Sequence, residues 1–116
     1  MILYAAADLI WASKIKATAD ALGLAARPVR TPDMLAARLA DTAPTALLVD
    51  LDKGDEALAL IRQARAASPS LRVVAFGPHV AKELLQAARE AGASDVLTRG
   101  ALEHNMEDVL VKLAGA

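Results

Sequence analysis

Carboxylates stand at the ends of two apolar segments, where a buried strand would carry them to the edge of a sheet. The clearest case is the stretch ALLVDLD, residues 46–52, in which four apolar residues run into Asp50 and Asp52 follows two places on. Asp8 stands in the same relation to the apolar residues 2–7. In a sheet of parallel strands, ligands and chemistry gather beyond the carboxyl ends of the strands. Asp50 is therefore either a reactive carboxylate or what is left of such a site.

Two later segments end in polar residues that would reach the same edge. Gly77-Pro78-His79 follows the apolar residues 71–76, and Arg99 follows residues 94–98. His79 is a candidate ligand or proton carrier, but a lone histidine with no second His or Cys beside it is weak evidence for a metal site. Together with Asp8, Asp50 and Asp52, these residues form the candidate rim of a site.

The elements that must position these residues alternate along the chain. The apolar pattern predicts strands at 2–7, 25–30, 45–50, 71–76 and 94–98. It predicts helices at 9–22, from Pro32 to near Asp41, at 55–67, from His79 to Gly92, and at about 102–114. Five such βα units imply a parallel sheet with helices on both faces. We predict a three-layer, flavodoxin-like α/β fold with strand order 2-1-3-4-5, because the weak second strand carries Pro28 and suits an edge.

The composition excludes several classes of protein and of binding site. The 116 residues suit a single domain over 1–116, and 55% of them are apolar, which is enough for a core. There is no cysteine, so disulfides and thiolate metal sites are excluded. The 13 basic residues are scattered and the net charge is −1, so we expect no nucleic-acid partner. No apolar run reaches the roughly 20 residues that cross a bilayer, so we expect no membrane association and a cytoplasmic location.

The βα pattern, the segment LLVDLD and the segment AREAGASDVLTRG resemble the receiver domain of two-component response regulators, the CheY-like fold. The resemblance extends over essentially the whole chain. It implies a domain that takes a phosphoryl group from a histidine kinase onto an aspartate. By this resemblance, Asp50 holds the position of the phosphoacceptor.

The other parts of the receiver site differ from the family pattern. The resemblance implies an acidic pair at the end of the first strand that binds Mg²⁺ with the acceptor, but this chain has residues 5–7, all alanine, followed by Asp8. A Ser or Thr is implied at Gly77, a Lys at Arg99, and a switch aromatic at Val96. Phosphoryl transfer depends on positioning and on neutralisation of charge. We therefore expect no cofactor, with Mg²⁺ only if Asp50 is phosphorylated, and Asp8 and Asp50 as the weak candidates for its ligands.

Each singled-out residue also has a structural interpretation. We expect Asp50 to form an ion pair with Arg99, because a guanidinium binds a carboxylate with two donors and reaches further than an ammonium. Asp8 is expected to be a helix N-cap. Asp52 and Lys53 are expected to be solvated. Trp11 is expected to pack in the core.

These expectations lead to three functional hypotheses. The first is a stand-alone pseudo-receiver, not an enzyme, that acts as a signalling interaction module with a protein partner such as a histidine kinase, or with itself. The second is a working phosphoacceptor that uses Asp50 in a phosphorelay. The third is a flavodoxin-like domain that binds a small ligand at the strand ends, although neither G-x-G-x-x-G nor a P-loop is present.

Overall fold

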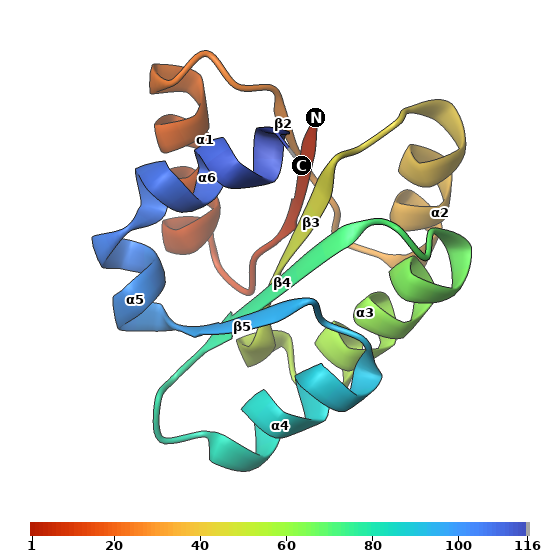
Figure 1. Cartoon of the computed structure of the whole chain (residues 1–116), viewed down its shortest axis with the longest axis vertical. Coiled ribbons are helices and arrows are strands. Elements are labelled where there is room, and N and C mark those ends of the chain that lie inside the picture. Colours follow the sequence, from red (N-terminus) through yellow and green to blue (C-terminus); the bar gives the residue numbers. More distant parts are fainter. Residues whose placement is uncertain (116) are drawn as a thin grey trace.

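The computed structural model describes residues 1–115 and has a five-stranded parallel sheet in the order β2-β1-β3-β4-β5 (Figure 1). The strands are β1 (Ile2–Ala5), β2 (Ala26–Pro28), β3 (Ala46–Asp50), β4 (Arg72–Gly77) and β5 (Asp95–Thr98). Both the fold class and the strand order predicted from the sequence are confirmed. The central strand β3 is buried over its whole length, as its unbroken apolar run requires, and β2 with Pro28 lies at an edge.

Helices cover both faces of the sheet. They are α1 (Leu9–Ala21), α2 (Pro32–Asp41), α3 (Asp55–Ala67), α4 (Lys82–Ala91), α5 (Arg99–His104) and α6 (Met106–Gly115), with a 3₁₀ turn, η1 (Leu51–Lys53). One buried cluster joins α2, α3 and α4 to one face of the sheet, and a second joins α1, α5 and α6 to the other (Figure 1). Within residues 1–115, no helix combines the length and the apolar character needed to span a membrane.

Several predicted boundaries are wrong around the carboxyl end of the sheet. The helix expected from His79 begins at Lys82, because residues 78–81 form a turn in which Ala81 N–H donates to the Pro78 carbonyl at 3.0 Å. Gly77 is the last residue of β4, one position beyond the predicted end of the strand. The first strand stops at Ala5 and leaves the next two residues as a link to the helix cap.

The expected last helix is divided in two. The first part, α5, starts directly after β5, where the Thr98 hydroxyl accepts from the Ala101 N–H at 3.1 Å. It ends at His104 and is capped by Asn105, whose backbone N–H and side-chain amide both donate to the Ala101 carbonyl at 3.0 Å. This arrangement makes Arg99 the first residue of a helix that packs on the same face of the sheet as α1.

Hydrogen bonds and packing of Arg65 explain why the segment AGAS, residues 91–94, precedes β5. Arg65 of α3 donates to the carbonyls of Gly92, Pro69 and Leu71 at 2.7–3.0 Å and to the Ser94 hydroxyl at 2.9 Å. Gly92 has a φ of 118°, and a Cβ at that position would lie 3.0 Å from Arg65 Cγ. The glycine is therefore required both by the left-handed backbone and by the arginine that packs against it.

Candidate functional site

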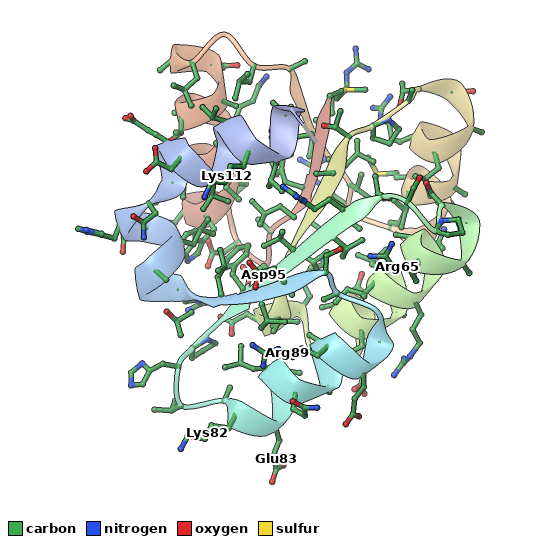
Figure 2. The ribbon with its side chains drawn as sticks, viewed as in Figure 1. Arg65, Lys82, Glu83, Arg89, Asp95 and Lys112 are labelled. Carbon is green, nitrogen blue, oxygen red and sulfur yellow. The ribbon has the colours of Figure 1, made fainter. Side chains whose placement is uncertain are left out.

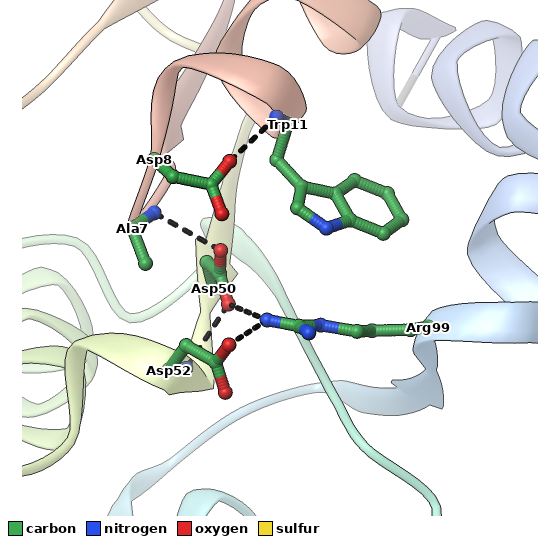
Figure 3. A network of polar contacts seen from close by, with 6 residues as sticks. All are labelled: Ala7, Asp8, Trp11, Asp50, Asp52 and Arg99. Carbon is green, nitrogen blue, oxygen red and sulfur yellow. Dashed lines mark hydrogen bonds and ion pairs between the residues drawn. The ribbon is translucent and has the colours of Figure 1, made fainter.

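Asp50 ends the central strand β3 and is the one charged residue of the described chain that is fully buried, at 0% exposure. Its two carboxylate oxygens have separate backbone donors, as Figure 3 shows: Oδ2 accepts from Ala7 N–H and Oδ1 from Asp52 N–H, both at 3.0 Å. Because β1 lies beside β3, the link after β1 passes close to the end of β3. The backbone thus holds this carboxylate in one orientation without help from other side chains.

Arg99 reaches the same point from the start of α5. Its Nη2 lies 3.6 Å from Asp50 Oδ1 and also donates to Asp52 Oδ2 (Figure 3). The sequence had suggested an Asp50–Arg99 pair and a solvated Asp52. The structure places one guanidinium between both carboxylates, and its closer contact is with Asp52. Asp52 is exposed, as expected, and is paired as well, whereas the expectation of a solvated Lys53 is wrong, because its side chain is only 13% exposed.

The environment of Asp50 favours its neutral form. Burial in the sheet edge raises the pKa of the Asp50 carboxyl above 3.8, and the negative charge of Asp8 adds to this. The Ala7 N–H bond, Arg99 and Lys53 act in the opposite direction and lower that pKa, but they do not outweigh burial. The ion pair therefore compensates part of the cost of burying this carboxylate.

The aromatic ring of Trp11 lies next to the arginine. The Arg99 guanidinium carbon is 5.8 Å from the centroid of the Trp11 ring, which packs at 5.0 Å from the ring of Phe76. Arg99 Nε is buried and has no hydrogen-bond partner within the described residues. The Trp11 ring therefore adds a cation–π attraction that helps to hold a guanidinium whose hydrogen-bond donors are not all paired.

The remaining predicted rim residues have other roles or lie apart. Asp8 caps α1 by accepting from Trp11 N–H at 2.9 Å. Gly77 is buried against Leu51, and a Cβ on Gly77 would lie 3.2 Å from Leu51 Cβ, so the place of a hydroxyl side chain is taken by leucine. His79 is exposed in the turn before α4, and no hydrogen bond or ion pair in residues 1–115 joins it to the other rim residues.

The sequence analysis did not identify two groups that contribute to the site, the Ala7 backbone N–H and the Trp11 ring. The Ala7 N–H is a backbone group, and its role cannot be predicted from a residue type. Trp11 was assigned to the core from its helical spacing, and it is indeed buried at 7% exposure, but its contact with Arg99 depends on the packing of α1 beside α5. The only available signal was the position of Trp11 three residues after the capping aspartate.

The residues present do not fit the Mg²⁺ site that the fold implies. Mg²⁺ prefers oxygen ligands in a near-octahedral arrangement, usually one or two carboxylates with waters and phosphate. At the end of β1 the chain offers Ala6 and Ala7, and Ala7 presents an N–H donor to Asp50 where a cation would need an oxygen. Arg99 already neutralises Asp50, and no cluster of three or more His, Cys, Asp or Glu suited to a metal occurs in residues 1–115.

Comparisons with known proteins support the fold. No protein-family model matches the sequence, and no curated protein matches it. Among solved structures, the receiver domain of NtrX from Brucella abortus superposes with a TM-score of 0.84 at 20% identity, covering 100% of this chain and 99% of that one. A response regulator from Thermotoga maritima gives 0.80 at 20% identity, covering 99% and 97%.

A third structure agrees with these two. A CheY-like response regulator receiver domain protein from Methanospirillum hungatei gives a TM-score of 0.75 at 17% identity, covering 97% of this chain and 94% of that one. The chain therefore has the fold of response-regulator receiver domains over its length, as the sequence resemblance predicted. At such identities the likeness concerns the fold, and the chemistry has to be judged from the site itself.

Proposed function

We propose that this chain is a pseudo-receiver: a non-enzymatic signalling module that keeps the receiver fold for binding proteins and does not use Mg²⁺-dependent phosphorylation. One observation carries the proposal. The cation at the acceptor aspartate is the chain's own Arg99, which is shared between Asp50 and Asp52.

The chemistry of phosphoryl transfer explains why this arrangement matters. An incoming phosphoryl group brings negative charge, and working sites neutralise it with metal ions and placed cations. Here a phosphoryl group on Asp50 would have to displace Arg99 or the backbone donors that hold both oxygens. The neighbouring carboxylates are already engaged, Asp52 by Arg99 and Asp8 by the Trp11 N–H, and Gly77 offers no hydroxyl.

The surface made by α4, β5 and α6 supports a role in protein binding. Figure 2 shows charges of both signs there, with Arg89 on α4, Asp95 on β5 and Lys112 on α6, while Lys82 and Glu83 of α4 point away from β5. A groove of about 530 Å³ lies between β5 and α6, floored by apolar residues and edged by charged ones. A mixed apolar and charged surface of this kind suits a protein partner, either a histidine kinase or another signalling protein, or a second copy of the chain.

The test is phosphorylation with a small donor. The protein is incubated with acetyl phosphate and Mg²⁺, or with beryllofluoride and Mg²⁺, and examined by intact-mass spectrometry and by amide NMR spectra. A receiver domain that accepts phosphate from acetyl phosphate serves as the positive control, and Asp50→Ala as the matched negative control. We expect no mass increase and no shifted resonances. A mass increase that Asp50→Ala abolishes would establish the alternative, a working phosphoacceptor, and overturn the proposal.

A further inference from the structure

Trp11, the single tryptophan of the chain, lies within reach of two cations that belong to different parts of the surface. We infer that Trp11 couples the negative charge of Asp50 to the surface between α1 and α5, with Arg99 as the link to the site and Lys14 as the link to the surface. The inference rests on the proposed function, because it treats Arg99, and not a metal ion, as the cation beside Asp50.

The first step runs from Asp50 to Arg99. The charged groups around Asp50 are Asp8 at the start of α1, Asp52 and Lys53 in η1, and Arg99 in α5. Arg99 is held by two carboxylates, one fully buried and one 40% exposed. If Asp50 loses its charge, Asp52 alone attracts the guanidinium, and we expect Arg99 to shift relative to the indole.

The second step runs from Arg99 to the indole of Trp11. Trp11 is held at two points: its backbone N–H donates to the Asp8 side chain, and its ring lies 5.0 Å from the ring of Phe76, which is the β4 partner of Asp50 in the sheet register. Figure 3 shows the indole beside the Arg99 side chain. Because the ring is buried and anchored, a shift of the cation changes the field at the indole and is not absorbed by free rotation of the ring.

The third step runs from the indole to the surface. Lys14 Nζ lies 5.2 Å from the ring centroid, and the same ammonium forms an ion pair with Glu103 of α5. The contacts thus run from Arg99 to Trp11, from Trp11 to Lys14 and from Lys14 to Glu103, which belongs to the helix that Arg99 begins. Lys14 and Glu103 line a groove of about 620 Å³ between α1 and the last two helices, and His104 lines it too.

On the opposite side of the sheet, the residue after Asp50 is the aliphatic Leu51, which packs against Gly77 and in one cluster with Leu84 and Leu85 of α4. Gly77 has no side chain to respond to Asp50, and Val96, on β5, packs against the cluster of α2, α3 and α4. Val96 is aliphatic and has no polar group that could form or lose a hydrogen bond with the site. The charged and aromatic contacts of the described residues therefore lead from Asp50 toward α1 and α5, whereas the contacts toward α4 are apolar packing.

The test removes the charge of Asp50 and follows where the change travels. Amide and indole NMR spectra of Asp50→Asn are compared with the wild type, with Asp55→Asn as a control that alters an exposed carboxylate at the start of α3. We expect Asp50→Asn to shift the Trp11 indole N–H and the amides of Lys14, Glu103 and His104 more than those of α4. Asp55→Asn should leave the indole resonance in place.

A second pair of variants tests the links themselves. In a Lys14→Gln background, Asp50→Asn should still shift the indole resonance but have a smaller effect at Glu103, because only α5 then joins Glu103 to Arg99. In a Trp11→Leu background, provided that it folds, the effect at Lys14 should be lost. Effects of Asp50→Asn that are confined to α4 and β5, or that persist undiminished at Glu103 in the Lys14→Gln background, would overturn the inference. Phosphorylation of Asp50 by acetyl phosphate would overturn the proposed function and leave this measurement valid.

Discussion

Replacing Arg99 by methionine isolates the energetic role of the guanidinium. Methionine keeps much of the length and the apolar contacts of the side chain but removes the charge beside Asp50. Truncating one partner of a buried ion pair commonly costs about 3–5 kcal/mol, because the remaining charge is left buried without compensation. Here Asp50 keeps two backbone N–H bonds, the separation is 3.6 Å and the Arg99 side chain is 30% exposed. We therefore expect a smaller loss of unfolding free energy at neutral pH, about 1–3 kcal/mol.

The loss should depend on pH in a defined direction. Burial raises the pKa of Asp50 above 3.8, so the folded state binds the proton more tightly than the unfolded state does. The contribution of Asp50 to stability is therefore largest when it is protonated and declines as the pH rises from 3.8 through the folded-state pKa. Arg99 lowers that pKa, so Arg99→Met raises it further. The destabilisation by Arg99→Met should thus shrink as the pH falls.

Urea denaturation followed by far-UV circular dichroism, at neutral and at mildly acidic pH, measures this effect. Circular dichroism is preferable to fluorescence because Trp11 lies beside the substituted residue. The control is Arg99→Met in the Asp50→Asn background, where the loss should be smaller and nearly independent of pH. An equal loss at both pH values in the otherwise wild-type protein would refute the reasoning, since it would mean that Arg99 stabilises the fold by packing and not by compensating the Asp50 charge.

Three further changes test the framework around the site by the same denaturation assay. Arg65→Ala should cost about 2–4 kcal/mol, because it removes the donors to three carbonyls and one hydroxyl, whereas Arg62→Ala on the exposed side of α3 should change little. Gly92→Ala should cost about 1–3 kcal/mol, because of its φ of 118° and the 3.0 Å approach to the arginine; Gly100→Ala, which meets nothing within 4 Å in a helix, should be neutral or stabilising. Asp8→Ala should cost about 1 kcal/mol as the loss of an N-cap, and this cost should be the same with and without Mg²⁺; a loss that appears only with Mg²⁺ would contradict the assignment of Asp8 as a cap.

Much of the fold could be predicted because local patterns carry it. Apolar runs of strand length alternate with helical spacing, and Asp8, Thr31 and Gly92 mark helix ends through their own backbone and side-chain chemistry. The edge position of the Pro28 strand followed from its missing donor. The boundaries near the site were predicted less well, because the turn over 78–81 and the division between α5 and α6 depend on local hydrogen bonds that no residue pattern specified.

The site was predicted only in part. The resemblance to receiver domains implied acids, a hydroxyl and a lysine at positions where the sequence has other residues, and this difference can be seen position by position. The sequence also named Asp50 and Arg99 as neighbours, because strand ends converge at one edge of a parallel sheet. The bridging role of Asp52 was not predictable, because it depends on how η1 turns the carboxylate toward α5.

The sequence by itself determined the order of the elements, the edge of the sheet at which polar residues gather and the identity of the residues that stand there. Those features follow from periodicity, from backbone propensity and from residue identity, all of which are local properties. Only the tertiary structure decided that one guanidinium lies between two carboxylates, that Leu51 fills the space beside Gly77, and that Trp11 contacts both Arg99 and Lys14. Those contacts join segments that are far apart in the chain, and their geometry is set by how α1, η1 and α5 pack around the end of β3.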